Sequence, residues 1–219
     1  MHCQPPKSRI CSAPVKFNTN PIMKTQSLRH KNGFTLVELL VVIAIIAVLA
    51  GAAAPMALSA IQKARRTTAL NTCVAIASAV NNYYTEYGAM PKDSMSEDTL
   101  VDTTKTNIDF LNVLLGTETG TTPLNTRAIK FLNVKQGKGN KDGLMYASGS
   151  TGTITGLYDP WGGRYFVMLD GDYDEKIEVQ PAAATEKTIL NGRRVAVWSN
   201  GADGTSGSGG KIPDDVKTW

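Results

Sequence analysis

The sequence predicts an α+β protein in which one long N-terminal helix packs on a small antiparallel β-sheet. Three observations indicate this class. An uncharged run of twenty residues occupies 39–58, an apolar stripe with helical spacing follows it as far as Tyr87, and short strand patterns separated by turn-rich stretches follow in the last third of the 219-residue chain. Helix followed by a run of strands is typical of α+β folds.

Residues 1–33 form a separate basic leader. They contain six of the 23 lysines and arginines and no acidic residue, which leaves 17 basic against 19 acidic side chains in the rest of the chain. The net charge of +4 therefore comes from the leader, and we expect no nucleic-acid partner. Cys3 and Cys11 also lie there, so Cys73 alone cannot form an intrachain disulfide after the leader is removed.

The uncharged run 39–58 is long enough to cross a bilayer. At a rise of ~1.5 Å per residue it spans roughly 30 Å, the thickness of the hydrocarbon core, and we assign residues 34–58 as the transmembrane half of a helix. This segment argues against a fully soluble cytoplasmic protein. Gly51 and Pro55 are expected to kink or locally melt the helix, because proline removes one backbone hydrogen bond and clashes with the preceding turn.

The second half of the helix is amphipathic. Apolar side chains recur at alternating spacings of four and three residues and form one stripe, comprising Ala69, Cys73, Ile76, Val80, Tyr83 and Tyr87. Gly88 is expected to cap the helix and Pro91 prevents its resumption, so the helix should cover 34–87.

Residues 88–219 are expected to form one globular domain whose sheet covers the stripe. A short helix is predicted at 107–115, and strands are predicted at 164–169, 176–180 and 193–199. Between the first two strands, Asp170, Asp172 and Asp174 alternate as at the start of an EF-hand loop. The glycine and the closing glutamate of that loop are missing, however, so a hairpin turn is favoured there.

Gly33 ends the basic leader, Phe34 follows it, and Glu38 lies five residues into the remaining chain, immediately before the apolar run. This arrangement resembles the type III signal of type IV pilins and type II secretion pseudopilins. The resemblance implies that a membrane-embedded prepilin peptidase cuts between Gly33 and Phe34 and methylates the new N-terminus. It also implies the type IV pilin-like fold.

Glu38 has two interpretations. A carboxylate in apolar surroundings needs a cation or must be neutralised. The resemblance implies that Glu38 pairs with the amine of Phe34 on a neighbouring copy, so that a homopolymer grows in register. The alternative is an interfacial glutamate favoured by the N-terminus of the helix.

The stretch from Ser199 to Gly204, Ser-Asn-Gly-Ala-Asp-Gly, and the two aspartates before the C-terminus resemble the calcium loop of major pseudopilins. The resemblance implies that the side chains of Asp203, Asp214 and Asp215 ligate Ca²⁺. It also implies backbone carbonyl ligands from Asn200 and from Ser206 or Ser208. Calcium takes six to eight oxygen ligands in flexible geometry, which suits such a loop. The basic insertion Lys211-Ile212-Pro213 departs from the pattern, and the alternative is a flexible tail that binds nothing. A further motif, Tyr158-Asp159-Pro160-Trp161-Gly162-Gly163, indicates a turn initiated by proline with an aromatic anchor.

We interpret the chain as a structural subunit of a type II secretion pseudopilus, of the major pseudopilin kind. The expected partners are further copies of itself, minor pseudopilins, the inner-membrane assembly platform and prepilin peptidase. The chain would cross the bacterial inner membrane once, with residues 88–219 in the periplasm.

Three other functions compete with this interpretation. A type IV pilin shares every feature up to Tyr87, and a secreted soluble domain would result from signal-peptidase cleavage near Ala52–Ala54. An enzyme is not expected, because both histidines, His2 and His30, lie in the leader and no catalytic motif marks the remainder.

Overall fold

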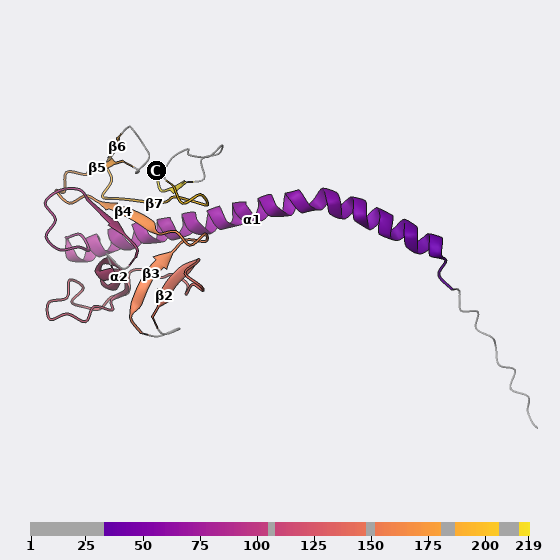
Figure 1. Ribbon diagram of the computed structural model, residues 1–219. Helices are drawn as coiled ribbons and strands as arrows, with labels where there is room; N and C mark the ends of the chain where they lie inside the picture. Colours follow the sequence, from indigo (N-terminus) through magenta and orange to yellow (C-terminus); the bar gives the residue numbers. More distant parts are fainter. Residues whose placement is uncertain (1–32, 105–107, 148–151, 181–186, 206–214) are drawn as a thin grey trace, which may run out of the picture. The chain divides into compact units, whose positions relative to one another are not determined.

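The structure is a computed structural model that describes residues 33–104, 108–147, 152–180, 187–205 and 215–219 (Figure 1). The chain divides into two units, Met1–Leu49 and Ala50–Trp219, and every described strand belongs to the second. One long helix, a short helix and antiparallel strands confirm the predicted α+β class.

Helix α1 (Leu36–Tyr87) contains 52 residues. It is helical throughout, including Gly51 and Pro55, and the kink expected near these two residues stays a prediction. Its C-terminus agrees with the sequence pattern: Gly88 has a φ of 67°, and its N–H donates to the carbonyl of Tyr84 at 2.8 Å. A residue without Cβ adopts this left-handed conformation at little cost, so Gly88 caps the helix as predicted.

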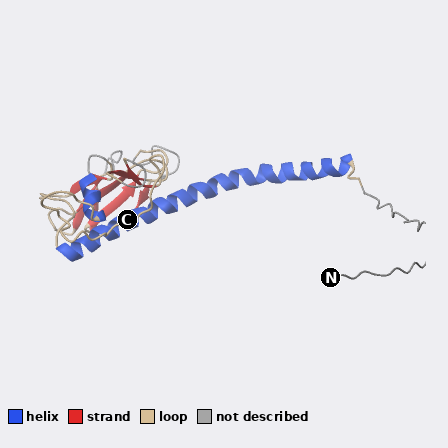
Figure 2. Cartoon of the chain, turned by 90° about the horizontal axis from the view of Figure 1, so that it is seen from below, coloured by secondary structure: helices blue, strands red, loops and turns tan. Residues whose placement is uncertain are grey.

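Three antiparallel sheets follow α1 in the chain, drawn in red in Figure 2. The largest has the strand order β1-β4-β7-β8, and β2-β3 and β5-β6 are two-stranded. The strands are β1 (Thr99–Asp102), β2 (Gly143–Tyr146), β3 (Ile154–Tyr158), β4 (Tyr165–Leu169), β5 (Lys176–Val179), β6 (Thr188–Asn191), β7 (Val195–Ser199) and β8 (Val216–Lys217).

The apolar stripe of α1 packs on one face of the four-stranded sheet. Five of its six members are buried, and Tyr87 is partly buried against the same core. The sheet contributes alternate residues to this core, namely Val101, Tyr165, Val167, Leu169, Val195 and Val197. Side chains alternate between the faces of a strand, so the intervening residues must find cover on the other side.

The β5-β6 hairpin provides that cover. Ile177 and Val179 of β5 are buried in a second cluster with Ala196 and Trp198 of β7. Trp198 also stacks on Phe166 of β4, with ring centroids 5.3 Å apart. The main sheet is therefore packed on both faces, which explains why all five residues of β7 are buried.

The structure confirms some of the predicted elements and corrects others. The predictions for 164–169 and 193–199 correspond to β4 and β7, and α2 (Ile108–Leu115) confirms the short helix. The segment predicted at 176–180 is β5, but it pairs with β6 outside the main sheet. The hairpin turn expected at the acidic stretch is wrong, because β4 pairs with β1 and β7 and not with β5.

Candidate functional site

The first turn of α1 is closed by reciprocal hydrogen bonds between Thr35 and Glu38. The N–H and the hydroxyl of Thr35 donate to Oε2 of Glu38 at 2.9 and 2.7 Å, and the N–H of Glu38 donates to Oγ1 of Thr35 at 3.2 Å. This capping box satisfies backbone donors that have no partner inside the helix. Gly33 and Phe34 precede the helix, so the backbone at the expected cut is non-helical, and both residues are exposed.

The N-terminal half of α1 presents apolar side chains on every side. None of the described residues from Leu36 to Leu49 is buried within the chain. The large ones are Leu36, Val37, Leu39, Leu40, Val41, Val42, Ile43, Ile45, Ile46, Val48 and Leu49. In the described part of the chain, α1 is the one helix long and apolar enough to cross a membrane. A helix that is apolar all round is typical of a membrane span.

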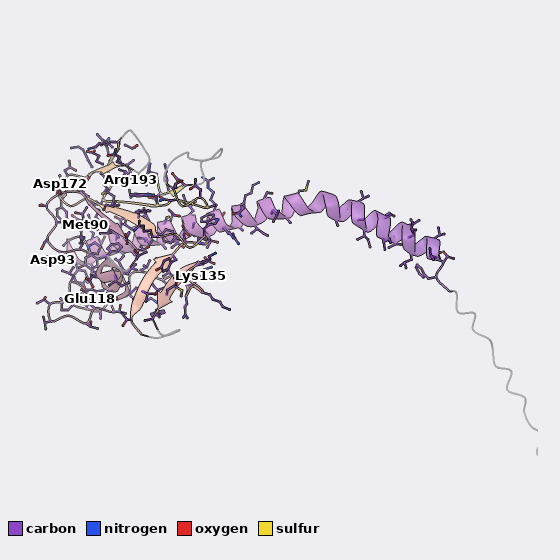
Figure 3. The ribbon with its side chains drawn as sticks, in the orientation of Figure 1. Met90, Asp93, Glu118, Lys135, Asp172 and Arg193 are labelled. Atoms are coloured by element: carbon purple, nitrogen blue, oxygen red, sulfur yellow. The ribbon has the colours of Figure 1, made fainter. Side chains whose placement is uncertain are left out.

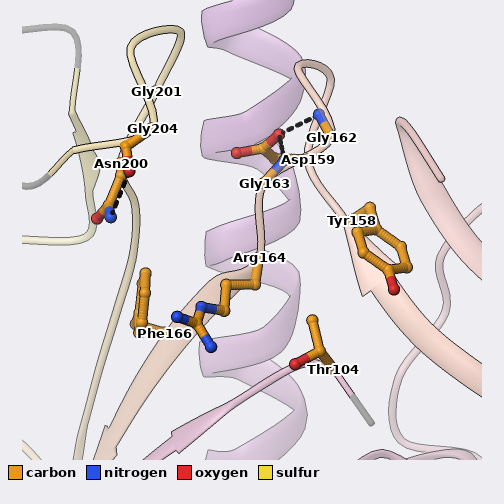
Figure 4. A pocket seen from close by; sticks show the side chains of 10 residues that line it. All are labelled: Thr104, Tyr158, Asp159, Gly162, Gly163, Arg164, Phe166, Asn200, Gly201 and Gly204. Atoms are coloured by element: carbon orange, nitrogen blue, oxygen red, sulfur yellow. Dashed lines mark hydrogen bonds between the residues drawn. The ribbon is translucent and has the colours of Figure 1, made fainter.

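In the globular unit, Asp159 organises two loops (Figure 4). Its side chain is 1% exposed, and Oδ1 accepts the backbone N–H groups of Trp161, Gly162 and Gly163 at 2.9, 2.8 and 2.8 Å. Oδ2 accepts the hydroxyl of Ser199 at 2.6 Å. The Asp-Pro-Trp-Gly-Gly turn is thereby joined to the end of β7, where the proposed calcium loop begins.

Both loops are also tied to α1. The indole Nε1 of Trp161 donates to Oε1 of Gln62 at 3.2 Å, and the guanidinium of Arg66 donates to the backbone carbonyl of Asp215 at 3.2 Å. These two polar residues lie one turn apart on the helix, so they can hold both loops from the same side.

The predicted calcium ligands are placed only in part, since Ser206 and Asp214 lie outside the described residues. The Nδ2 of Asn200 donates to the carbonyl of Gly204 at 3.3 Å. Oδ1 of Asp203 accepts the N–H of Thr205 at 2.8 Å. Asp215 is buried, and its Oδ2 lies 3.6 Å from Nζ of Lys217. The donor chemistry suits calcium, and with Ser206 and Asp214 outside the described residues the ligand set as a whole stays a prediction.

A family model described as a prokaryotic N-terminal methylation motif matches residues 28–54, which contain Gly33, Phe34, Glu38 and most of the apolar run. Fimbrial protein EcpC of Eikenella corrodens is 27% identical over 125 residues, which is 57% of this chain and 80% of that protein. Type IV major pilin protein PilE of Neisseria gonorrhoeae is 39% identical over 66 residues, 30% of this chain and 40% of that protein. The N-terminal part of the chain therefore carries the methylation motif, and the chain is similar to a fimbrial protein and to a type IV pilin.

No solved structure matches the chain. The methylation motif together with one apolar helix indicates a membrane-anchored, single-pass protein. The individual roles assigned to Gly33, Phe34 and Glu38 stay predictions, as does calcium binding by the C-terminal loop.

Two residues that organise the described chain lie outside the sequence-based predictions. Thr35 forms a Thr-x-x-Glu capping box with Glu38, and this signal is readable in the local sequence. The sequence predicts that Asp159 is part of a turn and gives it no role of its own. Its position before Pro160 and a Gly-Gly pair is typical of an aspartate that accepts backbone N–H groups, but its partner Ser199 is forty residues away in the chain.

Proposed function

We propose that the chain is the structural subunit of a membrane-anchored filament, cut by prepilin peptidase between Gly33 and Phe34 and polymerised through α1. The observation that carries the proposal is the Gly-Phe-x-x-x-Glu motif at the start of an apolar helix that the described chain leaves exposed. Such a surface requires lipid before assembly and neighbouring helices after it.

The assembly role of Glu38 follows from its charge in this setting. Within its own chain, the carboxylate receives hydrogen bonds from Thr35 but forms no ion pair among the described residues. Cleavage after Gly33 would produce a charged amine on Phe34. Pairing of that amine with Glu38 of a neighbouring copy would neutralise both groups in apolar surroundings and fix the axial register, as single buried polar pairs do elsewhere.

Variants at the capping box separate the charge of Glu38 from its capping role. Glutamine also functions at this position of a capping box, so Glu38→Gln keeps the helix start and removes the charge. Thr35→Ala weakens the cap and keeps the charge. Each variant is expressed with prepilin peptidase and an assembly machinery, the mature N-terminus is identified by mass spectrometry, and sheared filaments are quantified.

We expect N-methyl-Phe34 in both variants, with filaments reduced at least tenfold in Glu38→Gln and much less in Thr35→Ala. Wild-type filament yields from Glu38→Gln would exclude the ion pair. Gly33→Leu should retain the precursor mass and form no filament, because a side chain obstructs the backbone in the peptidase cleft. A mature N-terminus near Pro55 would instead indicate an ordinary signal peptidase and a secreted domain.

Within this filament class we favour the pseudopilus of a type II secretion system, acting in protein export with minor pseudopilins and an inner-membrane assembly platform and with the globular unit in the periplasm. The similarity of the C-terminal loop to the calcium loop of major pseudopilins supports this choice. The second candidate is a type IV pilus pilin, which the similarity to EcpC and PilE favours. Deleting the gene distinguishes them: loss of exported proteins from the medium indicates a pseudopilin, and loss of surface fibres with normal export indicates a pilin.

Calcium binding by the C-terminal loop is part of the pseudopilin proposal. Asn200, Asp203 and Asp215, with Ser206 and Asp214 of the same loop, supply the oxygen donors that calcium prefers. The ion would tie the chain end to the Asp159 turn, which already contacts Ser199 at the start of this loop. Asp203→Asn should lower calcium uptake by one ion per chain in equilibrium dialysis, and unchanged uptake would remove this part of the proposal.

A further inference from the structure

A second group of acidic side chains lies at one end of the four-stranded sheet, where β1 begins and β4 ends. Asp159 lies at the other end, before β4 begins. Thr99 of β1 pairs with Leu169 of β4, so the antiparallel register brings Asp98, just before β1, opposite Asp170, just after β4. Asp172, labelled in Figure 3, lies two residues further along the loop. One carboxylate oxygen from each of Asp98, Asp170 and Asp172 lies within 4.8 Å of the other two.

Asp170 is the centre of this cluster and is fully buried. Its Oδ2 accepts the N–H of Glu175 at 3.1 Å, and Oδ2 of Asp98 accepts the N–H of Glu178 at 2.9 Å. Within the part of the chain that the structure describes, neither Oδ1 of Asp170 nor Oδ1 of Asp98 accepts a hydrogen bond, although both atoms are buried. Buried carboxylate oxygens without a donor are rare, and each points to a missing partner.

Neighbouring cations do not supply that partner. The nearby Lys176 and Arg194 pair with Asp174 and Glu175, and among the described residues none of the three clustered aspartates forms a salt bridge. Burial, together with the adjacent carboxylate of Asp172, raises the pKa of both Asp98 and Asp170 above the usual value for aspartate. The cluster thus lacks the positive charge that would stabilise it in ionised form.

Gly171 fixes the spacing of the cluster. A Cβ atom at this position would lie 2.0 Å from the backbone carbonyl oxygen of Glu97, so the loop after β4 touches the segment before β1 with no room for a side chain. The backbone segment before β1, which carries Asp98, is therefore in contact with the loop after β4, which carries Asp170 and Asp172. The carboxylates are brought together by the fold and not by chance orientation of surface side chains.

We propose that Asp98, Asp170 and Asp172 bind a divalent cation of the calcium class. The donors are all hard oxygens, and an upper separation of 4.8 Å matches two ligands on opposite sides of an ion bound at about 2.4 Å. Magnesium demands near-ideal octahedral geometry and gives up its water reluctantly, so calcium suits this cluster of three carboxylates better. Asp172 is exposed, so water can complete the coordination and the ion can enter from solvent.

The cation would join three strands, namely β1 and β4 of the main sheet and β5 of the neighbouring hairpin. Asp98 belongs to the start of β1 and also receives the N–H of Glu178 in β5, while Asp170 and Asp172 belong to the end of β4. This site shares no residue with the C-terminal loop and does not depend on the proposed function.

The test uses the full chain in detergent micelles, stripped of metal by a chelator and then titrated with CaCl₂. Calcium per chain is measured by equilibrium dialysis, and melting is followed by tryptophan fluorescence. All variants carry Asp203→Asn as background, which removes a ligand of the C-terminal calcium site proposed above. We expect one calcium ion per chain in this background and a rise in melting temperature of roughly 5–10 °C at a hundredfold excess over the Kd.

Asp170→Asn should abolish both the uptake and the rise. Because it removes a buried charge without changing shape, it should melt in chelator no lower than its background, which excludes misfolding as the cause. Asp174→Asn is the matched control: it removes one acidic charge from the same loop outside the cluster and should keep the ion. Absence of calcium uptake in the background at millimolar CaCl₂, or equal loss in the Asp170 and Asp174 variants, would overturn the site.

Discussion

Replacing Asp159 with alanine should destabilise the globular unit more than any other single loop substitution. The carboxylate accepts four hydrogen bonds, three from backbone N–H groups of the 161–163 turn and one from Ser199. A hydrogen bond to a charged group contributes about 1.5–3 kcal/mol, but three donors share one oxygen here and their contributions do not add. Water can also reach the turn from the pocket of about 320 Å³ that it lines (Figure 4).

We therefore expect Asp159→Ala to lower the free energy of unfolding by about 3–5 kcal/mol. Asp159→Asn keeps an acceptor for the turn and loses only the charge, and it should cost about 1–2 kcal/mol. Asp93→Ala is the control, because Asp93 is exposed and accepts a single bond from Ser94, so its loss should cost under about 0.5 kcal/mol.

Urea denaturation followed by tryptophan fluorescence measures these differences. All three tryptophans of the chain, Trp161, Trp198 and Trp219, lie in the second unit, so the signal reports that unit alone. With a slope near 2 kcal/mol per M urea, Asp159→Ala should lower the midpoint by roughly 2 M. A decrease of less than about 0.5 M, or an asparagine variant less stable than the alanine variant, would refute the role assigned to this carboxylate.

Two further predictions use the same assay. Gly88→Ala should cost about 1–2 kcal/mol through backbone strain alone, because its φ is 67° and a Cβ there meets nothing within 4 Å, whereas Gly88→Asn should cost less. Burial alone would raise the pKa of Asp102, but hydrogen bonds from Thr104 and the guanidinium of Arg164 outweigh it and hold that pKa below its usual value. A lowered folded pKa gives stability that is present above the unfolded pKa and lost as pH falls through the folded one. The advantage of wild type over Asp102→Asn should thus be full at pH 7 and shrink below about pH 4, and a pH-independent difference would contradict it.

The long helix was predictable because its determinants are local. The stripe that ends at Tyr87, the capping glycine and the uncharged run each depend on spacing within one segment, and the structure agrees with the stripe and the cap. β4 was predictable for the same reason, since its buried and half-buried residues alternate strictly.

Elements defined by their partners were missed. β8 contains two residues and forms only by pairing with β7, and β3 contains a glycine that weakens its strand pattern. The acidic stretch after β4 contains ordinary turn residues, but both edges of β4 are already occupied, so β5 must leave the sheet. No local pattern carries that information.

The same distinction applies to the sites. Gly33, Phe34 and Glu38 form a contiguous motif, so sequence alone was sufficient to select them. Asp98 carries no signal of its own and meets Asp170 only through the register of β1 and β4. The EF-hand pattern covers only residues of the acidic loop and its downstream positions, whereas the third carboxylate of the cluster, that of Asp98, lies upstream, before β1.

The uniform apolar surface at the start of α1 has a consequence for orientation. Leu36, Val48 and Leu49 point in different directions around the axis, yet all are exposed to a similar degree, at 78%, 72% and 65%. Rotation of this helix segment about its own axis changes the buried apolar area very little. The hydrophobic effect and dispersion therefore stabilise the segment in an apolar environment without selecting one rotation. Any preferred rotation must then come from the few hydrogen-bonding groups at its ends.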